Sequence, residues 1–96
     1  MSAPLWDVYP DKTVEDQLEA GGSENGRAVL QQLVEELART GPQVPDALRY
    51  PHPWPRTLWR TLIRVPGTTL VYGGIEYVEE THQRIRITGV HWLPGR

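Results

Sequence analysis

The chain has no cysteine, only two serines and only three histidines. Without cysteine there are no disulfide bonds, thiolate zinc sites or cysteine nucleophiles, as expected in a reducing compartment. The serines lie in the N-terminal tail and in a predicted loop, which argues against a serine-based triad. The histidines stand at positions 52, 82 and 91, without the close spacing typical of metal ligands. We therefore expect neither a metal nor a cofactor.

Long hydrophobic runs are also missing. No apolar stretch approaches the length needed to cross a bilayer, and residues 1–5 lack the basic and apolar parts of a signal peptide. We therefore expect a cytoplasmic protein that does not contact a membrane. A chain of 96 residues has room for one hydrophobic core, which predicts a single domain over 1–96.

Charge is divided unevenly along the chain, although the net charge is only −2. Residues 1–48 carry nine acidic and three basic residues, whereas residues 49–96 carry three acidic residues and seven arginines. Lysine is nearly absent, since Lys12 is the only one. The basic half suggests an anionic partner, but solvated ion pairs explain the arginines equally well.

The N-terminal half predicts one strand and two helices. Large apolar and polar residues alternate over 5–9, which is typical of a short strand. Thr13 resembles the cap of a short helix, which the glycine pair 21–22 ends. From Arg27 onward, apolar residues recur at helical spacing and predict a second helix, which the Thr-Gly-Pro sequence 40–42 terminates.

The C-terminal half predicts a connection and three strands. Segment 42–55 holds five prolines, which predicts an extended and irregular connection. We expect strands over 58–65, over 68–72 continuing at 75–78 after a glycine bulge at 73–74, and over 84–92. The order β-α-α-β-β-β predicts an α+β fold in which a small antiparallel sheet packs on two N-terminal helices.

The arginines fall on one side of the predicted sheet. Arginine alternates strictly with isoleucine over 84–87, so Arg84 and Arg86 share one strand face and the isoleucines share the other. Arg60 and Arg64 lie four residues apart and share a face of their own strand. With the isoleucines buried against the helices, these arginines predict a basic outer face.

The position of His91 depends on the geometry of the last strand. Counting by twos from Ile85 places Gly89 and His91 on the buried face, away from the arginines. A bulge at Gly89 would instead bring His91 to the arginine face. Two alternatives therefore stay open, a core-edge histidine bonded to the backbone or a histidine that transfers protons near neutral pH.

Several short segments share a likeness to one family. In chain order they are Leu37-Ala38-Arg39-Thr40-Gly41-Pro42, Asp46-Ala47-Leu48, Leu58-Trp59, Arg64, Leu70-Val71-Tyr72 and His91-Trp92. In type and order they resemble features of the RelE/ParE superfamily of toxins. The resemblance spans nearly the whole chain and implies a RelE/ParE-like fold. The chain departs from the family in its scarcity of lysine and in Thr69, where members often carry a basic residue.

The resemblance implies a toxin of a type II toxin–antitoxin system that cuts ribosome-bound mRNA without a metal ion. In that reaction the ribose 2′-hydroxyl attacks the neighbouring phosphate, which requires a base, an acid and cations. By the resemblance, Asp46 is the base, Arg64 contacts the phosphate and His91 is the acid. Trp92 takes the place of an aromatic residue that stacks a base. The remaining cations expected to hold RNA phosphates are Arg60, Arg84 and Arg86.

Each catalytic role has a structural alternative. Asp46 follows Pro45, and a solvated turn carboxylate explains that pair as well as a general base does. Arg64 could form a surface ion pair with Glu76 or Glu80 instead of binding phosphate.

Two other functions also stay open. Thr69 and the scarcity of lysine favour a non-enzymatic toxin of the ParE type, which inhibits DNA gyrase by binding it. The other is an inactive member that binds a partner through apolar edges and the proline-rich segment 42–55. The expected partners are a cognate antitoxin and either ribosome-bound mRNA or DNA gyrase, in a homodimer or a toxin–antitoxin hetero-oligomer.

Overall fold

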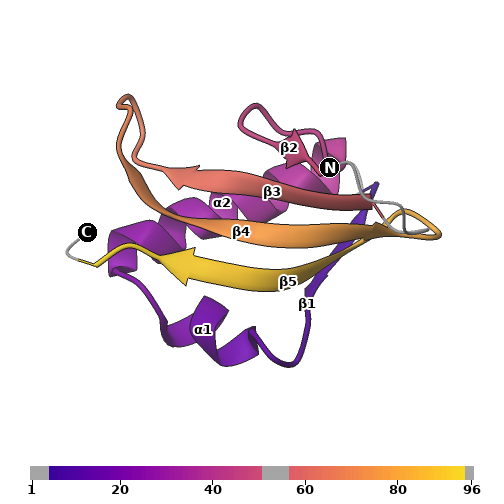
Figure 1. Ribbon diagram of the computed structural model, residues 1–96, viewed down its shortest axis with the longest axis horizontal. Coiled ribbons are helices and arrows are strands. Elements are labelled where there is room, and N and C mark those ends of the chain that lie inside the picture. The colour runs from indigo at the N-terminus through magenta and orange to yellow at the C-terminus, as the bar shows by residue number, and fades with distance from the viewer. Residues whose placement is uncertain (1–4, 51–56, 95–96) are drawn as a thin grey trace.

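The computed structural model describes residues 5–50 and 57–94 (Figure 1). Along the chain it has β1 (Asp7–Pro10), α1 (Glu15–Ala20), α2 (Glu24–Thr40), β2 (Leu48–Arg49), β3 (Thr57–Arg64), β4 (Val71–Glu80) and β5 (Arg84–Trp92). The strands form one five-stranded sheet in the order β1-β5-β4-β3-β2, and α2 packs against one of its faces (Figure 1). The predicted α+β class is confirmed.

The sheet is mixed, whereas an antiparallel sheet was expected. β1 runs parallel to β5, with Asp7 opposite Arg84 and Pro10 opposite Ile87. The other neighbours are antiparallel. The two helices between β1 and the remaining strands carry the chain back across the molecule, so that β1 can enter the sheet in the parallel direction.

A short strand lies where the sequence predicts only irregular backbone. β2 pairs antiparallel with β3, with Leu48 opposite Arg60 and Arg49 opposite Trp59. The prolines at 42 and 45 precede this pair of residues and therefore do not remove its ladder hydrogen bonds. Residues 51–55 of the predicted connection lie outside the described residues.

Helix α2 supplies most of the helical packing. It begins before the predicted Arg27, because the Ser23 side chain caps it by accepting a hydrogen bond from the Gly26 N–H at 3.0 Å. Its buried Leu30 and Leu37 pack with the inner residues of the sheet. Helix α1 buries no residue completely and contacts this core through the half-buried Leu18. The sheet therefore rests mainly on one of the two helices.

A bulge in β5 reverses the faces of the last residues of the chain. Tyr77 is opposite Ile87, but its neighbour Glu76 is opposite Gly89, so Thr88 has no partner in the register. Before this bulge, Ile85 and Ile87 point into the core. Beyond it, the alternation is shifted by one residue.

A second bulge lies at the end of the β3–β4 hairpin. Ile63 is opposite Gly73 and Arg64 is opposite Val71, which leaves Tyr72 as the extra residue. The prediction of a bulge at 73–74 was therefore wrong by one residue. The half-buried Tyr72 packs toward the core. The shift places Val71 on the outer face of the sheet, where Arg64 lies by ordinary alternation along β3.

Among the described residues, no helix has both the length and the apolar character needed to cross a membrane.

Candidate functional site

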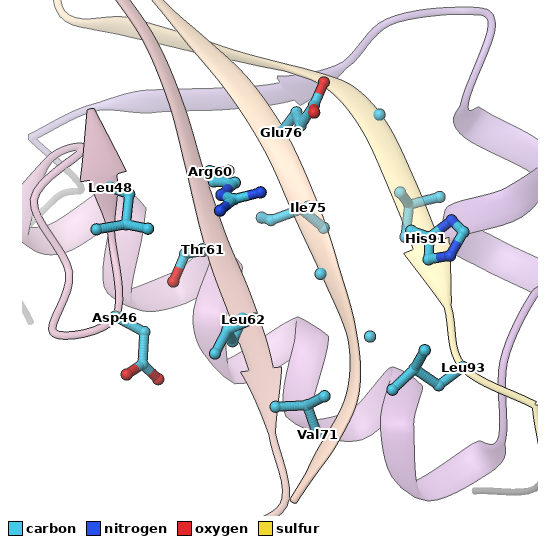
Figure 2. Close-up of a pocket in the computed structure, with 14 residues that line it drawn as sticks. Asp46, Leu48, Arg60, Thr61, Leu62, Val71, Ile75, Glu76, His91 and Leu93 are labelled. Carbon is cyan, nitrogen blue, oxygen red and sulfur yellow. The ribbon is translucent and has the colours of Figure 1, made fainter. Parts of the chain in front are cut away.

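A groove of about 650 Å³ lies on the outer face of the sheet, opposite α2 (Figure 2). It runs from the loop before β2, across β3 and β4, to β5. Its polar side chains are Asp46, Arg60, Glu76 and His91. Its larger apolar side chains are Leu48, Leu62, Val71 and Leu93. The buried Thr61 and Ile75 and the inward-facing Val90 border the groove only through their backbone. The groove therefore combines charged groups with an apolar surface.

Strand register explains the arrangement of the groove. One row across the sheet contains Arg60, Glu76 and Gly89, because Arg60 is opposite Glu76 and Glu76 is opposite Gly89. The next row contains Leu62, Gly74 and His91. Since Gly74 and Gly89 carry no side chain on the outer face, the backbone forms the floor between the flanking side chains.

His91 lies on the outer face because of the bulge at Thr88 and Gly89. Its position opposite the outer-face residue Gly74 follows from the shifted register. The imidazole is exposed and lines the groove (Figure 2). The sequence leaves open which face of the last strand carries His91, and in the structure His91 lies on the same face as the arginines.

Asp46 and Arg64 form a two-point ion pair at one side of the groove. The Arg64 Nε and Nη2 atoms donate to the two Asp46 carboxylate oxygens, each at 2.9 Å. The hydrogen bonds from Arg64 hold the pKa of Asp46 below its usual range, and those to Asp46 raise the pKa of Arg64. The side chains remain 32% and 36% exposed, respectively. Arg64 thus pairs with Asp46, and not with Glu76 or Glu80.

The loop that carries Asp46 is fixed from inside the core. The hydroxyl of the fully buried Tyr77 donates to the Pro42 carbonyl oxygen at 2.5 Å. Burial raises the pKa of Tyr77, so this hydroxyl remains a donor at physiological pH. Val44 is also buried, and Ala47 packs against the core. These contacts place Asp46 within reach of Arg64.

Arg60 and Glu76 are directly opposite one another, yet neither takes part in the ion pairs formed among the described residues. The Arg60 guanidinium instead lies over the ring of Tyr50, 5.5 Å from its centroid. Glu76 is exposed at one end of the groove (Figure 2) and lies opposite Gly89 in the register. Both charges therefore remain available to a molecule in the groove.

Arg84 and Arg86 lie at another part of the outer face, where β1 meets β5. Arg84 contacts Asp7 at 3.5 Å and lies over the Tyr9 ring, 4.6 Å from its centroid. Arg86 contacts Asp11 at 3.2 Å and Glu80 at 3.5 Å. Acidic groups thus accompany these arginines, and the expectation of a basic outer face was wrong.

Trp92 lies on the core side of β5 and outside the groove. Its indole nitrogen donates to the Gln17 carbonyl oxygen at 3.1 Å. Its ring lies so close to the backbone of Gly21 and Gly22 that a side chain at either glycine would overlap it. The ring therefore packs the loop between the two helices against the sheet. Its position outside the groove does not support the predicted role of Trp92 in stacking an RNA base.

The structure brings together three of the predicted site residues, Asp46, Arg60 and His91, in one groove, with Arg64 joined to it through Asp46. Glu76 is a groove residue that the sequence reasoning missed, because it was considered only as an ion-pair partner of Arg64. Its position opposite Arg60 depends on the β3–β4 register. No group of three or more metal-binding side chains occurs within the described ranges 5–50 and 57–94.

No protein-family model, curated protein or solved structure matches this chain. The groove and the resemblance of individual segments therefore carry the functional argument.

Proposed function

We propose that this chain is the toxin of a type II toxin–antitoxin system and cleaves ribosome-bound mRNA in the cytoplasm without a metal ion. The observation that carries this proposal is the β5 bulge, which brings His91 into the groove that Asp46 and Arg60 also line. A histidine, a carboxylate and cations are the groups that RNA cleavage through the 2′-hydroxyl requires.

In the proposed reaction, Asp46 accepts the proton of the ribose 2′-hydroxyl as the 2′-oxygen forms its bond to phosphorus. The bond from phosphorus to the 5′-oxygen breaks, and His91 donates a proton to that oxygen. The products are a 2′,3′-cyclic phosphate and a free 5′-hydroxyl. Asp46 and His91 lie on opposite sides of the groove, with β3 and β4 between them (Figure 2). Both groups must come within hydrogen-bond reach of the same phosphate, so the reaction requires bound RNA to draw the Asp46 loop toward His91.

The Asp46–Arg64 pair has two consequences for this reaction. Arg64 holds the carboxylate in one orientation and supplies a cation for the phosphate. It also lowers the pKa of Asp46, which makes the carboxylate a weaker base. We therefore expect slow cleavage by the isolated protein and faster cleavage where bound RNA draws Arg64 away from Asp46.

A non-catalytic toxin is the second candidate, because the groove exposes apolar surface that phosphate binding does not need. Leu48 and Leu62 are 57% and 41% exposed, and Leu93 is 38% exposed. Such a surface suits a protein partner, either a cognate antitoxin or, for a toxin of the ParE type, DNA gyrase.

Inducible expression in a bacterial host separates these functions. We expect the parent chain to arrest growth and to generate new RNA 5′ ends, and Arg64→Ala combined with His91→Ala to abolish both. Purified protein should cut the same RNA in the presence of EDTA. The matched control is Arg39→Ala combined with His82→Asn, because both residues are exposed and lie outside the groove.

Growth arrest without new RNA ends, together with inhibition of purified gyrase, would contradict the proposed nuclease activity. It would support a toxin that acts by binding gyrase. If the variant with Arg64→Ala and His91→Ala arrested growth as strongly as the parent, the proposed roles of these two residues would be wrong.

A further inference from the structure

The row that contains Arg60 and Glu76 is unusual for a surface that binds RNA. Residues directly opposite each other on neighbouring antiparallel strands usually interact, and opposite charges there stabilise the sheet. In this protein Arg60 lies over Tyr50, and Glu76 lies beside Gly89. The row therefore presents a cationic donor next to an anionic acceptor, and neither group neutralises the other.

A carboxylate in this position would repel the phosphates of a bound RNA. The Glu76 carboxylate favours binding where the ligand offers hydrogen-bond donors to it, because a carboxylate accepts hydrogen bonds through both oxygens. The exposed edge of a nucleobase can offer two adjacent donors, whereas the ribose 2′-hydroxyl offers only one.

The floor beside Glu76 suits a flat ring. Gly74 and Gly89 leave bare backbone on the outer face, and Leu62 and His91 stand on either side of Gly74. A side chain at Gly89 would lie 3.7 Å from the Glu76 Cβ and Oε2 atoms, within contact of the carboxylate. The two glycines thus keep the approach to Glu76 open for an unpaired base.

We propose that the groove binds guanine, with Glu76 accepting from N1–H and the N2 amino group and Arg60 donating to O6. This inference rests on the proposed action on RNA and names the base that the groove selects. The Watson–Crick edge of guanine carries one acceptor followed by two donors, which matches one guanidinium beside one carboxylate. Adenine and cytosine each present a single amino donor beside a ring acceptor, and uracil presents one donor between two acceptors, so each would place an acceptor against Glu76.

Binding of mononucleotides tests this selection without any cleavage. The purified protein is titrated with 5′-GMP, 5′-IMP and 5′-AMP, and the amide signals of Gly74 and Gly89 are followed by NMR. All three probes carry the same phosphate, so differences in affinity report on the base. We expect 5′-IMP, which lacks the N2 amino group, to bind about tenfold more weakly than 5′-GMP, and 5′-AMP to bind more weakly still.

One variant and one control test whether Glu76 is the residue that selects guanine. Glu76→Gln should abolish the preference for 5′-GMP over 5′-AMP, because the amide offers only one acceptor in place of two. Glu19→Gln is the matched control, since Glu19 is exposed on α1 and lies outside the groove. This control should retain the preference of the parent.

Equal binding of the three nucleotides would overturn the inference, and RNA cleavage without base preference would then leave the proposed function standing. Selective 5′-GMP binding without RNA cleavage would support the inference and refute the nuclease. If Glu76→Gln stopped cleavage at every site while leaving the 5′-GMP preference unchanged, the inference would also fail, because Glu76 would then act as a proton acceptor.

Discussion

Two parts of the outer sheet face carry the same kind of cation in different surroundings. At the β1–β5 edge, Arg84 and Arg86 contact carboxylates, and the Tyr9 hydroxyl donates to Glu80 beside them. In the groove over β3 and β4, Arg60 lies over the ring of Tyr50. It takes part in none of the ion pairs formed among the described residues. Position on a strand face therefore does not decide whether an arginine is available to a ligand.

The cause of this difference is the direction in which β1 enters the sheet. Its parallel pairing with β5 places Asp7 opposite Arg84 and brings Asp11 within 3.2 Å of Arg86. The acidic half of the chain thus lies against part of the basic half. At the other edge of the sheet, β2 places Leu48 opposite Arg60, so the neighbour of Arg60 on that strand is apolar instead of acidic.

The largest effect that we expect comes from removing the histidine of the groove. His91→Ala should lower the rate of RNA cleavage by about 100-fold or more, because a positioned acid contributes roughly 10²–10⁴-fold. The matched control is His82→Asn, since asparagine tolerates the positive φ of 62° at this exposed turn. Single-turnover cleavage of a short RNA measures both. If His91→Ala left the cleavage rate unchanged, the groove would not be the catalytic part of the outer sheet face.

The next largest effect concerns the floor of the groove. A Cβ atom at Gly73 would lie 2.0 Å from the His91 carbonyl oxygen, so Gly73→Ala must push β4 and β5 apart. We expect a loss of about 1–3 kcal/mol in the free energy of unfolding, as for other overpacked sites. Gly89→Ala is the control, because its Cβ would make only ordinary contacts at 3.7 Å. Urea unfolding of the two variants measures the difference, and equal stabilities would contradict the strand register.

A direct comparison of the two arginine regions gives a smaller effect. Arg60→Ala should weaken binding of a short guanine-containing RNA by about tenfold, since a hydrogen bond from a charged donor is lost. Arg84→Ala should leave this affinity nearly unchanged, because Arg84 already contacts Asp7 and Tyr9. Fluorescence anisotropy at fixed salt measures both affinities. The comparison fails if Arg84→Ala weakens binding as much as Arg60→Ala does.

The smallest effect is a change in the acid sensitivity of folding. Arg64 lowers the pKa of Asp46 in the folded protein, so the pair stabilises the fold above the unfolded pKa of about 3.9. That contribution is lost as the pH falls through the lower, folded pKa. Asp46→Asn should therefore show a shallower loss of stability than the parent below about pH 4, when thermal unfolding is followed from pH 7 to pH 2. An identical acid profile would show that the pair contributes nothing to stability in solution.

Local patterns in the sequence determined much of the fold. The alternation around Ile85 and Ile87 predicted correctly which side of β5 is buried. The apolar spacing after Arg27 predicted the second helix, and its apolar face carries the buried Leu30 and Leu37. Both predictions succeed because the periods of strands and helices are properties of neighbouring residues. The choice of Asp46, Arg60, Arg64 and His91 also came from the sequence, but their placement together did not.

Tertiary structure alone decided which of the charged residues meet. The sequence contained no sign that Asp46 would pair with Arg64, 18 residues later, because that contact depends on the loop held by Tyr77 and Pro42. Nor did the sequence choose between the two faces for His91, since one unpaired residue at Thr88 reverses the alternation beyond it. Alternation is set by each strand itself, whereas register and bulges are set by the partner strand, and for that reason the groove appears only in the folded chain.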